Sequence, residues 1–310
     1  TCLTNIMLKY AADLRSLAFL GFATCLLFIQ WNSETFHPLL WLCSMFFAVT
    51  VAVIAHNHNH VPMWKSELLN RLTDYWITLF YGFPTFAWIP THNKNHHKFN
   101  NKPGDYTITY RFSEDNNLWT LLSYPSISSY YQQIPIAEYL KKCWQKDRGK
   151  FWFAISQYVV LAAMILTALI LDWQKAVLYI LLPHQAALFT VLVFNYLQHV
   201  HADETSPTNH SRNFTSPILN FLLFNNGYHT VHHDNANLHW SKWKDAHDKI
   251  AHTISPRLIE KSFWGYLFRT YILGAFMDKY KSQSLRLERL QSTGKDSKSS
   301  PSMPQTVSAV

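Results

Sequence analysis

The sequence predicts an all-α membrane protein. Four transmembrane helices form two hairpins that carry a cytoplasmic helical cap with a dimetal centre, and further helices lie at the membrane interface. Two observations predict the membrane part, namely four long apolar segments and a concentration of Lys and Arg on one side of them. The third observation is that many of the 17 histidines form short clusters, which favours a metal site. An apolar fraction of 48% with 12 Trp fits a partly embedded chain.

The apolar segments are each long enough to cross the hydrocarbon layer of a bilayer. They are predicted at about residues 14–31, 38–55, 151–171 and 176–197. Short connections, Asn32 to His37 and Asp172 to Lys175, join them in pairs and are too short to hold a domain. We therefore expect two hairpins.

Lys and Arg residues predict the orientation, because cytoplasmic flanks carry an excess of them. They gather before the first span and between the hairpins: Lys9, Arg15, Lys65, Arg71, Lys141, Lys142, Lys146, Arg148 and Lys150. Both termini and the central segment are therefore expected in the cytoplasm, with all histidine clusters on one side. The protein is expected to be multi-pass, in a bacterial inner membrane or an ER-type membrane.

Two shorter apolar runs are expected to lie along the interface. Tyr75 to Pro90 is interrupted by glycine and proline and is too short for a comfortable span, and Ile218 to Phe224 is shorter still. The predicted membrane domain covers residues 1–281. Residues 282–310 are rich in Ser, Lys, Gln and Pro and are expected to be a disordered tail.

The clustered histidines have the spacing of metal ligands. Residues four apart on a helix share a face, and adjacent residues diverge by about 100°, so one segment can address two metals. The candidate ligands are His56, His60, His92, His96, His97, His229, His232 and His233. Eight imidazoles are too many for one ion and suggest two metals, although a single such cluster could be a polar loop. His58 points away from His56 and His60 and is interpreted as a residue behind the ligands or at the surface.

The pattern HxxxH, HxxxHH and HxxHH across two hairpins resembles the membrane-bound fatty acid desaturase family, over most of residues 14–250. The resemblance implies a non-haem di-iron centre and O2 as a co-substrate. The run from Asn195 to His199 also matches an extra element of this family. It implies that His199 is a ninth ligand and that Asn195 holds a metal-bound water. Without the resemblance, the same run could be an ordinary helix end with a cation near the negative dipole.

Several polar residues near the clusters are expected to orient the imidazoles through hydrogen bonds. These are Asp105, Asn226, His201 and Asp203, with Glu204 close enough to contribute. His184, inside the fourth span, is either functional or satisfies carbonyls freed by the kink at Pro183. The other histidines are interpreted as surface or packing residues: His37, His210, His239, His247 and His252.

The expected function is O2-dependent desaturation of a lipid acyl chain. The chain shows no GxGxxG fingerprint, cysteine cluster or His-Pro-Gly-Gly haem signature, so a separate ferredoxin or cytochrome b5-like donor with its reductase is expected to supply electrons. The net charge of +8 fits either docking of an acidic donor or attraction to anionic lipid, and no nucleic-acid partner is expected.

Two other functions compete with desaturation. A fatty-acid or alkane hydroxylase, or a ketolase, would use the same histidines, because the reactions diverge only after the first hydrogen abstraction. Hydroxyl rebound then gives an alcohol, whereas a second abstraction gives an alkene. A membrane zinc-binding or transport protein is a remote alternative. Transport needs polar ligands at membrane depth, where the spans offer only His184 and, near an end, Asn195.

Overall fold

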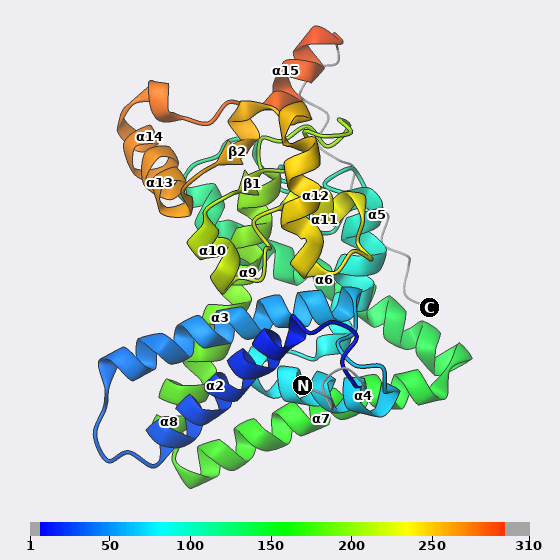
Figure 1. Ribbon diagram of the computed structural model, residues 1–310, viewed down its shortest axis with the longest axis vertical. Helices are drawn as coiled ribbons and strands as arrows, with labels where there is room; N and C mark the ends of the chain where they lie inside the picture. Colours follow the sequence, from blue (N-terminus) through cyan, green and yellow to red (C-terminus); the bar gives the residue numbers. More distant parts are fainter. Residues whose placement is uncertain (1–6, 295–310) are drawn as a thin grey trace. The chain divides into compact units, whose positions relative to one another are not determined.

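The computed structural model describes residues 7–294 (Figure 1), and the predicted all-α membrane fold is confirmed. Within residues 7–294, four helical segments are long and apolar enough to cross a membrane: Asp13–Trp31, Pro38–His60, Arg148–Leu171 and Trp173–His199. The second span is five residues longer than predicted. It carries the first histidine cluster on its own last turns, so these histidines are held by regular helix.

The described residues divide into two compact units, residues 7–93 with 134–191 and residues 94–133 with 192–294. The first unit contains α2 (Asp13–Trp31), α3 (Pro38–His60), α4 (Glu67–Tyr81), η1 (Thr85–Ala87), α7 (Arg148–Leu171), α8 (Trp173–Ala176) and the π-helix η3 (Val177–Leu181). The π-helix η2 (Ile89–His96), α6 (Leu118–Lys146) and α9 (Leu182–His199) continue through the division.

The second unit consists of short elements: α5 (His97–Phe99), β1 (Asn213–Phe214), α10 (Pro217–Leu222), α11 (His229–Asp234), η4 (Trp240–Lys242), α12 (Trp243–Ile250), η5 (Ala251–Thr253), η6 (Pro256–Leu258), β2 (Ile259–Glu260), α13 (Phe263–Leu267), the π-helix η7 (Phe268–Leu273), α14 (Gly274–Phe276), η8 (Asp278–Tyr280) and α15 (Leu285–Ser292). The two strands pair in parallel, with Asn213 opposite Ile259. The core of this unit packs the last turns of α9 against α13 and the start of α6.

Two hydrogen bonds tie the hairpins of the first unit together near their connections. The Lys175 ammonium donates to the Trp31 carbonyl at 2.6 Å, and the Trp41 indole donates to the Leu178 carbonyl at 2.9 Å. In the same unit, α4 lies against α2, α3 and α7. The two short connections therefore lie at the same end of the helices, as two hairpins require.

The first of the two shorter apolar runs, Tyr75 to Pro90, forms the end of α4 and then turns sharply at Gly82, whose φ is +83°. A Cβ atom at Gly82 would lie 2.4 Å from the His184 Cβ, so only glycine fits. The His184 ring bonds to the Leu79 carbonyl at 2.9 Å. His184 thus satisfies a carbonyl at the end of α4, rather than one freed in its own helix beside Pro183.

The expectation of a disordered tail from residue 282 is wrong for the residues that form α15. Arg286 and Arg289 of this helix bind the buried carboxylate of Glu204, and Arg289 also binds Asp203 at 2.8 Å. These ion pairs stabilise a segment whose own composition offers little apolar surface to bury. Residues 295–310 lie outside the described part of the chain.

Candidate metal centre

Four histidines of the second unit converge in a compact group: His96, His199, His229 and His233. One ring nitrogen from each lies within 4.8 Å of the others. The Nε2 atom of His199 is 3.1 Å from that of His96 and 2.9 Å from that of His229, and the His229 and His233 Nε2 atoms are 3.1 Å apart. Such an all-imidazole group is a donor set for a transition metal.

Local structure explains how three segments reach this group. His96 ends η2, His199 ends α9, and His229 and His233 are four apart on α11, so they share its face. α11 begins two residues after Gly227, where a Cβ atom would lie 2.0 Å from the Phe214 carbonyl oxygen. Glycine is required there because the turn passes so close to β1.

The buried carboxylate of Asp105 controls the proton on His96. It accepts from His96 Nδ1 at 2.8 Å, from the Asn101 amide at 2.8 Å, and from the amide and hydroxyl of Thr107, each at 2.7 Å. Burial alone raises the pKa of Asp105, but attraction to His96 and these hydrogen bonds outweigh it and lower the pKa to about 2. An ionised carboxylate only accepts, so the proton of neutral His96 is on Nδ1 and its Nε2 carries a lone pair.

His199 has the same tautomer. Its Nδ1 atom donates to the carbonyl of His210 at 3.3 Å, which leaves the lone pair on Nε2. The lone pairs of His96 and His199 therefore face each other at 3.1 Å. For two neutral rings, that arrangement is repulsive unless a cation, either a proton or a metal ion, lies between them. Burial and the neighbouring histidines also hold the pKa of His233 well below its usual range, so this ring is neutral and able to bind a metal.

In the first unit, the rings of His56, His60 and His92 contact one another. The His56 and His92 Nε2 atoms are 2.9 Å apart, and the His60 ring lies 4.9 Å from that of His56 and 5.1 Å from that of His92. His56 Nδ1 donates to the Asn57 side-chain oxygen at 3.0 Å, which directs the His56 Nε2 lone pair toward His92. The Trp88 indole packs edge-on against His56 and His92.

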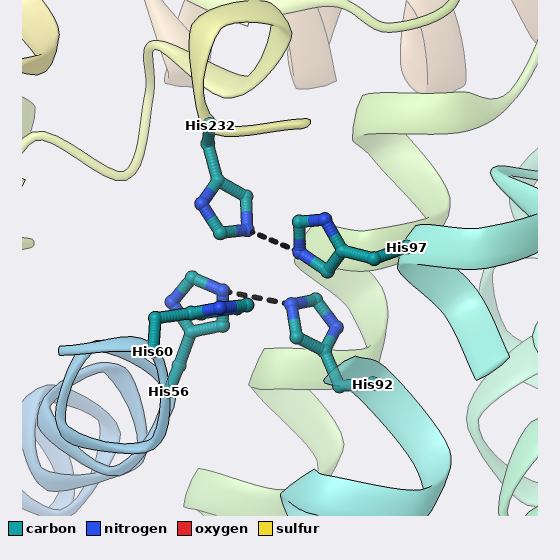
Figure 2. Close-up of side chains that lie close together, drawn as sticks. All are labelled: His56, His60, His92, His97 and His232. Carbon is teal, nitrogen blue, oxygen red and sulfur yellow. Dashed lines mark hydrogen bonds between the residues drawn. The ribbon is translucent and has the colours of Figure 1, made fainter. Parts of the chain in front are cut away.

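The second unit holds a further histidine pair. The Nε2 atoms of His97 and His232 lie 2.9 Å apart, and the buried Trp243 ring packs on His232 with 4.7 Å between ring centroids. Figure 2 shows this pair and the His56–His92 pair as two dashed contacts, with His60 beside the latter. All nine histidines predicted as ligands thus lie in contact with other histidines of the set.

His58 belongs to neither group of potential ligands, but the expectation that it could lie at the surface is wrong. It is buried because α3 packs against α4 on that side. Its Nδ1 atom accepts the amide proton of Met63 at 3.2 Å, and its Nε2 atom lies 3.7 Å from the Asp74 carboxylate. The partner of His58 is therefore a carboxylate on the neighbouring helix.

Asn195 lies one helical turn before His199, and its side chain has a defined orientation. Its amide nitrogen donates to the hydroxyl of the buried Tyr124 at 2.6 Å, and that hydroxyl donates to the Thr107 carbonyl at 2.7 Å. The amide nitrogen is therefore engaged, which leaves the Asn195 side-chain oxygen as the acceptor. Thr107 also contacts His96 Nδ1 at 2.9 Å, so the network connects the supports of two candidate ligands.

The other predicted supporting residues have different surroundings. The Asn226 carbonyl accepts from the Gln198 side chain, next to His199. His201 adopts a φ of +62°, and its ring bonds to the Glu114 carbonyl and the Ser282 hydroxyl instead of a clustered imidazole. Asp203 binds Arg289, in the ion-pair network that holds α15. Of these predicted residues, Asp105 has the direct contact with a candidate ligand.

Five residues whose side chains contact the clusters or their supports were not predicted from the sequence: Asn57, Trp88, Thr107, Tyr124 and Trp243. An aromatic side chain in an apolar segment indicates burial and nothing more specific. For Thr107 the sequence holds a local signal, because Thr107 follows the predicted Asp105 by two residues and can form a local turn with it.

The family model for fatty acid desaturases matches residues 34–277. This chain belongs to the fatty acid desaturase family. The matched range covers about four fifths of the chain and includes all nine candidate histidines and Asn195. No curated protein and no solved structure matches the chain. The desaturase family membership makes the protein a membrane oxidoreductase that acts on fatty acids.

The residues of this protein fit the iron centre that the family implies. Imidazole is a good iron ligand, and the Nε2 atoms of His96 and His199 face each other at 3.1 Å. Ligands at right angles about 2.1 Å from one ion have donor atoms roughly 3.0 Å apart. The observed Nε2 separations of 2.9–3.1 Å within the second unit agree with that spacing.

Proposed function

We propose that this protein is an O2-dependent acyl desaturase with a di-iron centre, which introduces a carbon–carbon double bond into a lipid acyl chain. The observation that carries the proposal is the pair of opposed Nε2 atoms of His96 and His199, 3.1 Å apart, in rings whose Nδ1 atoms bond to the Asp105 carboxylate and the His210 carbonyl. Family membership supports the substrate class. The membrane-spanning helices support a substrate drawn from the bilayer.

Each of two irons would have its own histidine set. One set would be His96, His199, His229 and His233, with a water held by the Asn195 side-chain oxygen. For the other iron, the first unit offers the ring cluster of His56, His60 and His92. Within the second unit, His97 pairs with His232, apart from the set that contains His96, so adjacent positions address different groups, as neighbours on a helix can.

When bound, the iron pair supplies activation of O2 and removal of hydrogen from an unactivated C–H bond. The chain's own residues keep the ligands ready for this chemistry. Asp105 holds the proton of His96 on Nδ1, and Tyr124 holds the Asn195 amide so that its oxygen can accept from water. Trp88 and Trp243 pack apolar surface against imidazole rings, which shields these rings from bulk water.

The reaction consumes one O2, two electrons and two protons for each alkene formed, and releases two waters. The electrons are proposed to come from a separate ferredoxin or cytochrome b5-like protein with its reductase. The excess of Lys and Arg, 27 against 19 acidic residues, supports an acidic donor. A reporter fused after Gln174 should report a non-cytoplasmic location if the clusters and both termini are cytoplasmic, and a cytoplasmic signal would reverse this topology.

The proposal is tested by expressing the protein with a donor system and analysing total lipids by gas chromatography and mass spectrometry. A new acyl product lighter by two hydrogen atoms supports desaturation. The His96→Ala variant serves as the inactive control, and its membrane level is verified by immunoblot. A product heavier by one oxygen atom would show a hydroxylase instead, and unchanged lipids in both strains with active donor would refute the assigned reaction.

A further inference from the structure

An apolar stripe runs along the helical segment formed by α13, η7 and α14. Trp264, Phe268, Ile272 and Phe276 follow one another at intervals of four residues, and their exposed fractions are 76%, 57%, 45% and 82%. A four-residue interval stays on one face through the α and π turns of this segment. Four large apolar side chains exposed side by side on one face of a helix are typical of a binding surface.

The opposite face of this segment is firmly packed. Ser262 caps α13 by accepting from the Gly265 amide, and Phe263, Tyr266 and Tyr271 are buried in the core of the second unit. The exposed side chains therefore belong to an ordered amphipathic element. Their exposure does not result from a loosely attached segment.

The packing connects this segment directly to the fourth span. The Phe263 ring stacks on Phe194 with 4.7 Å between centroids and 3° between planes, and Phe194 lies within the apolar helix Trp173–His199. α10 contributes Leu219 to the same core while exposing Ile218 and Phe221, at 74% and 57%. α13 and α10 thus both pack in the core that includes the last turns of the candidate span Trp173–His199, and both expose large apolar side chains.

The charges beside the stripe favour one kind of partner. Four cations and two anions lie between residues 260 and 281, which leaves a net charge of +2: Glu260, Lys261, Arg269, Asp278, Lys279 and Lys281. Arg269 pairs with Glu260 at 2.6 Å and Lys281 pairs with Asp278 at 2.7 Å. Apolar side chains bordered by basic ones are typical of helices that lie in the surface of an anionic membrane.

We propose that Phe263–Phe276 is a membrane-surface element, whose apolar stripe inserts into the leaflet next to the fourth span while the flanking cations bind anionic lipid headgroups. Continuity with the span favours lipid, because Phe263 packs on Phe194, which belongs to a helix long and apolar enough to cross a bilayer. A second copy of the chain or a docked protein would also cover such a stripe. Measurements of membrane depth distinguish these occupants from lipid.

The test measures the membrane depth of single labelled positions in the iron-loaded protein, reconstituted one copy per lipid nanodisc. Phe268→Cys and Phe276→Cys are each placed in a background with the four native cysteines replaced, and labelled with an environment-sensitive fluorophore. Lys244→Cys on the exposed face of α12 is the matched control. Quenching is compared between lipids that carry a nitroxide on the acyl chain and a water-soluble quencher, in neutral nanodiscs and in nanodiscs with anionic lipid.

We expect the labels at 268 and 276 to be quenched by the lipid nitroxides, at a depth of about 5–10 Å below the headgroups, and to be protected from the aqueous quencher. Anionic lipid should strengthen both effects, and the label at 244 should behave in the opposite way. Accessibility of 268 and 276 to the aqueous quencher equal to that of 244 would overturn the proposal. Protection from both quenchers would overturn it as well, because protein would then cover the stripe. Neither readout depends on catalytic activity, so the result is independent of the proposed reaction.

Discussion

Replacing Asp105 by Asn should weaken iron binding as well as the fold. The carboxylate accepts four hydrogen bonds, two on each oxygen. An amide has one oxygen, so in either orientation its NH2 group faces a backbone N–H, of Asn101 or of Thr107. In one orientation the NH2 group also faces His96 Nδ1, which would shift the proton of His96 to Nε2 and remove the lone pair meant for the metal.

The size of both effects can be worked out from these contacts. One buried backbone N–H left without an acceptor costs about 1–3 kcal/mol of folding stability. Loss of a carboxylate that orients a metal-bound histidine reduces metal affinity by roughly 10- to 100-fold. At about 1.4 kcal/mol per tenfold, this corresponds to about 1.4–2.8 kcal/mol of binding free energy. The loss of iron should therefore add to the loss of stability and not be explained by it.

The assay determines iron per folded protein by titration of the purified apoprotein, alongside thermal unfolding in detergent. Asp203→Asn is the control, because that carboxylate was also predicted beside the centre but binds Arg289. The control should keep its iron affinity. If Asp105→Asn bound iron as tightly as the wild type while losing stability, the carboxylate would be purely structural and the tautomer argument would be refuted.

Three further substitutions test other parts of the structure. Tyr124→Phe removes the hydroxyl that holds Asn195, so turnover should fall about tenfold or more while iron content, measured by mass spectrometry, is retained; Phe at full activity would exclude this positioning role. Burial raises the pKa of Asp74 to about 7 although Arg71 opposes it. Because the unfolded chain ionises this carboxyl at a lower pH, folding stability is lost as the pH rises from the pKa of Asp74 in the unfolded chain toward 7. The stability gain of Asp74→Asn in thermal unfolding should therefore grow between about pH 5 and about pH 8, and a constant difference would contradict the shift. Arg286→Ala should cost roughly 1–3 kcal/mol in thermal unfolding, because it removes a partner of a buried carboxylate, whereas Arg257→Ala on an exposed ion pair should cost at most about 1 kcal/mol.

Local sequence was sufficient to predict the spans but not α15. Hydropathy is summed over neighbouring residues, so four apolar helices could be read directly from the chain. α15 is polar and gains its stability from Arg286 and Arg289, which reach back about 85 residues to Glu204. Composition predicts disorder for such a segment because the partner carboxylate is distant in sequence. The same reason explains why Tyr124 was not predicted beside Asn195, 71 residues away.

Helical spacing identified the candidate ligands, because residues four apart share a face in every sequence context. It could not predict which nitrogen of each ring carries the proton. That choice depends on the Asp105 carboxylate for His96 and on the His210 carbonyl for His199, and these partners lie outside the histidine motifs. In neutral rings, the two Nδ1 donors leave two Nε2 lone pairs opposed at 3.1 Å, an arrangement that a metal ion between them would satisfy. The metal-binding chemistry of this protein therefore depends as much on the two acceptors behind the rings as on the histidines themselves.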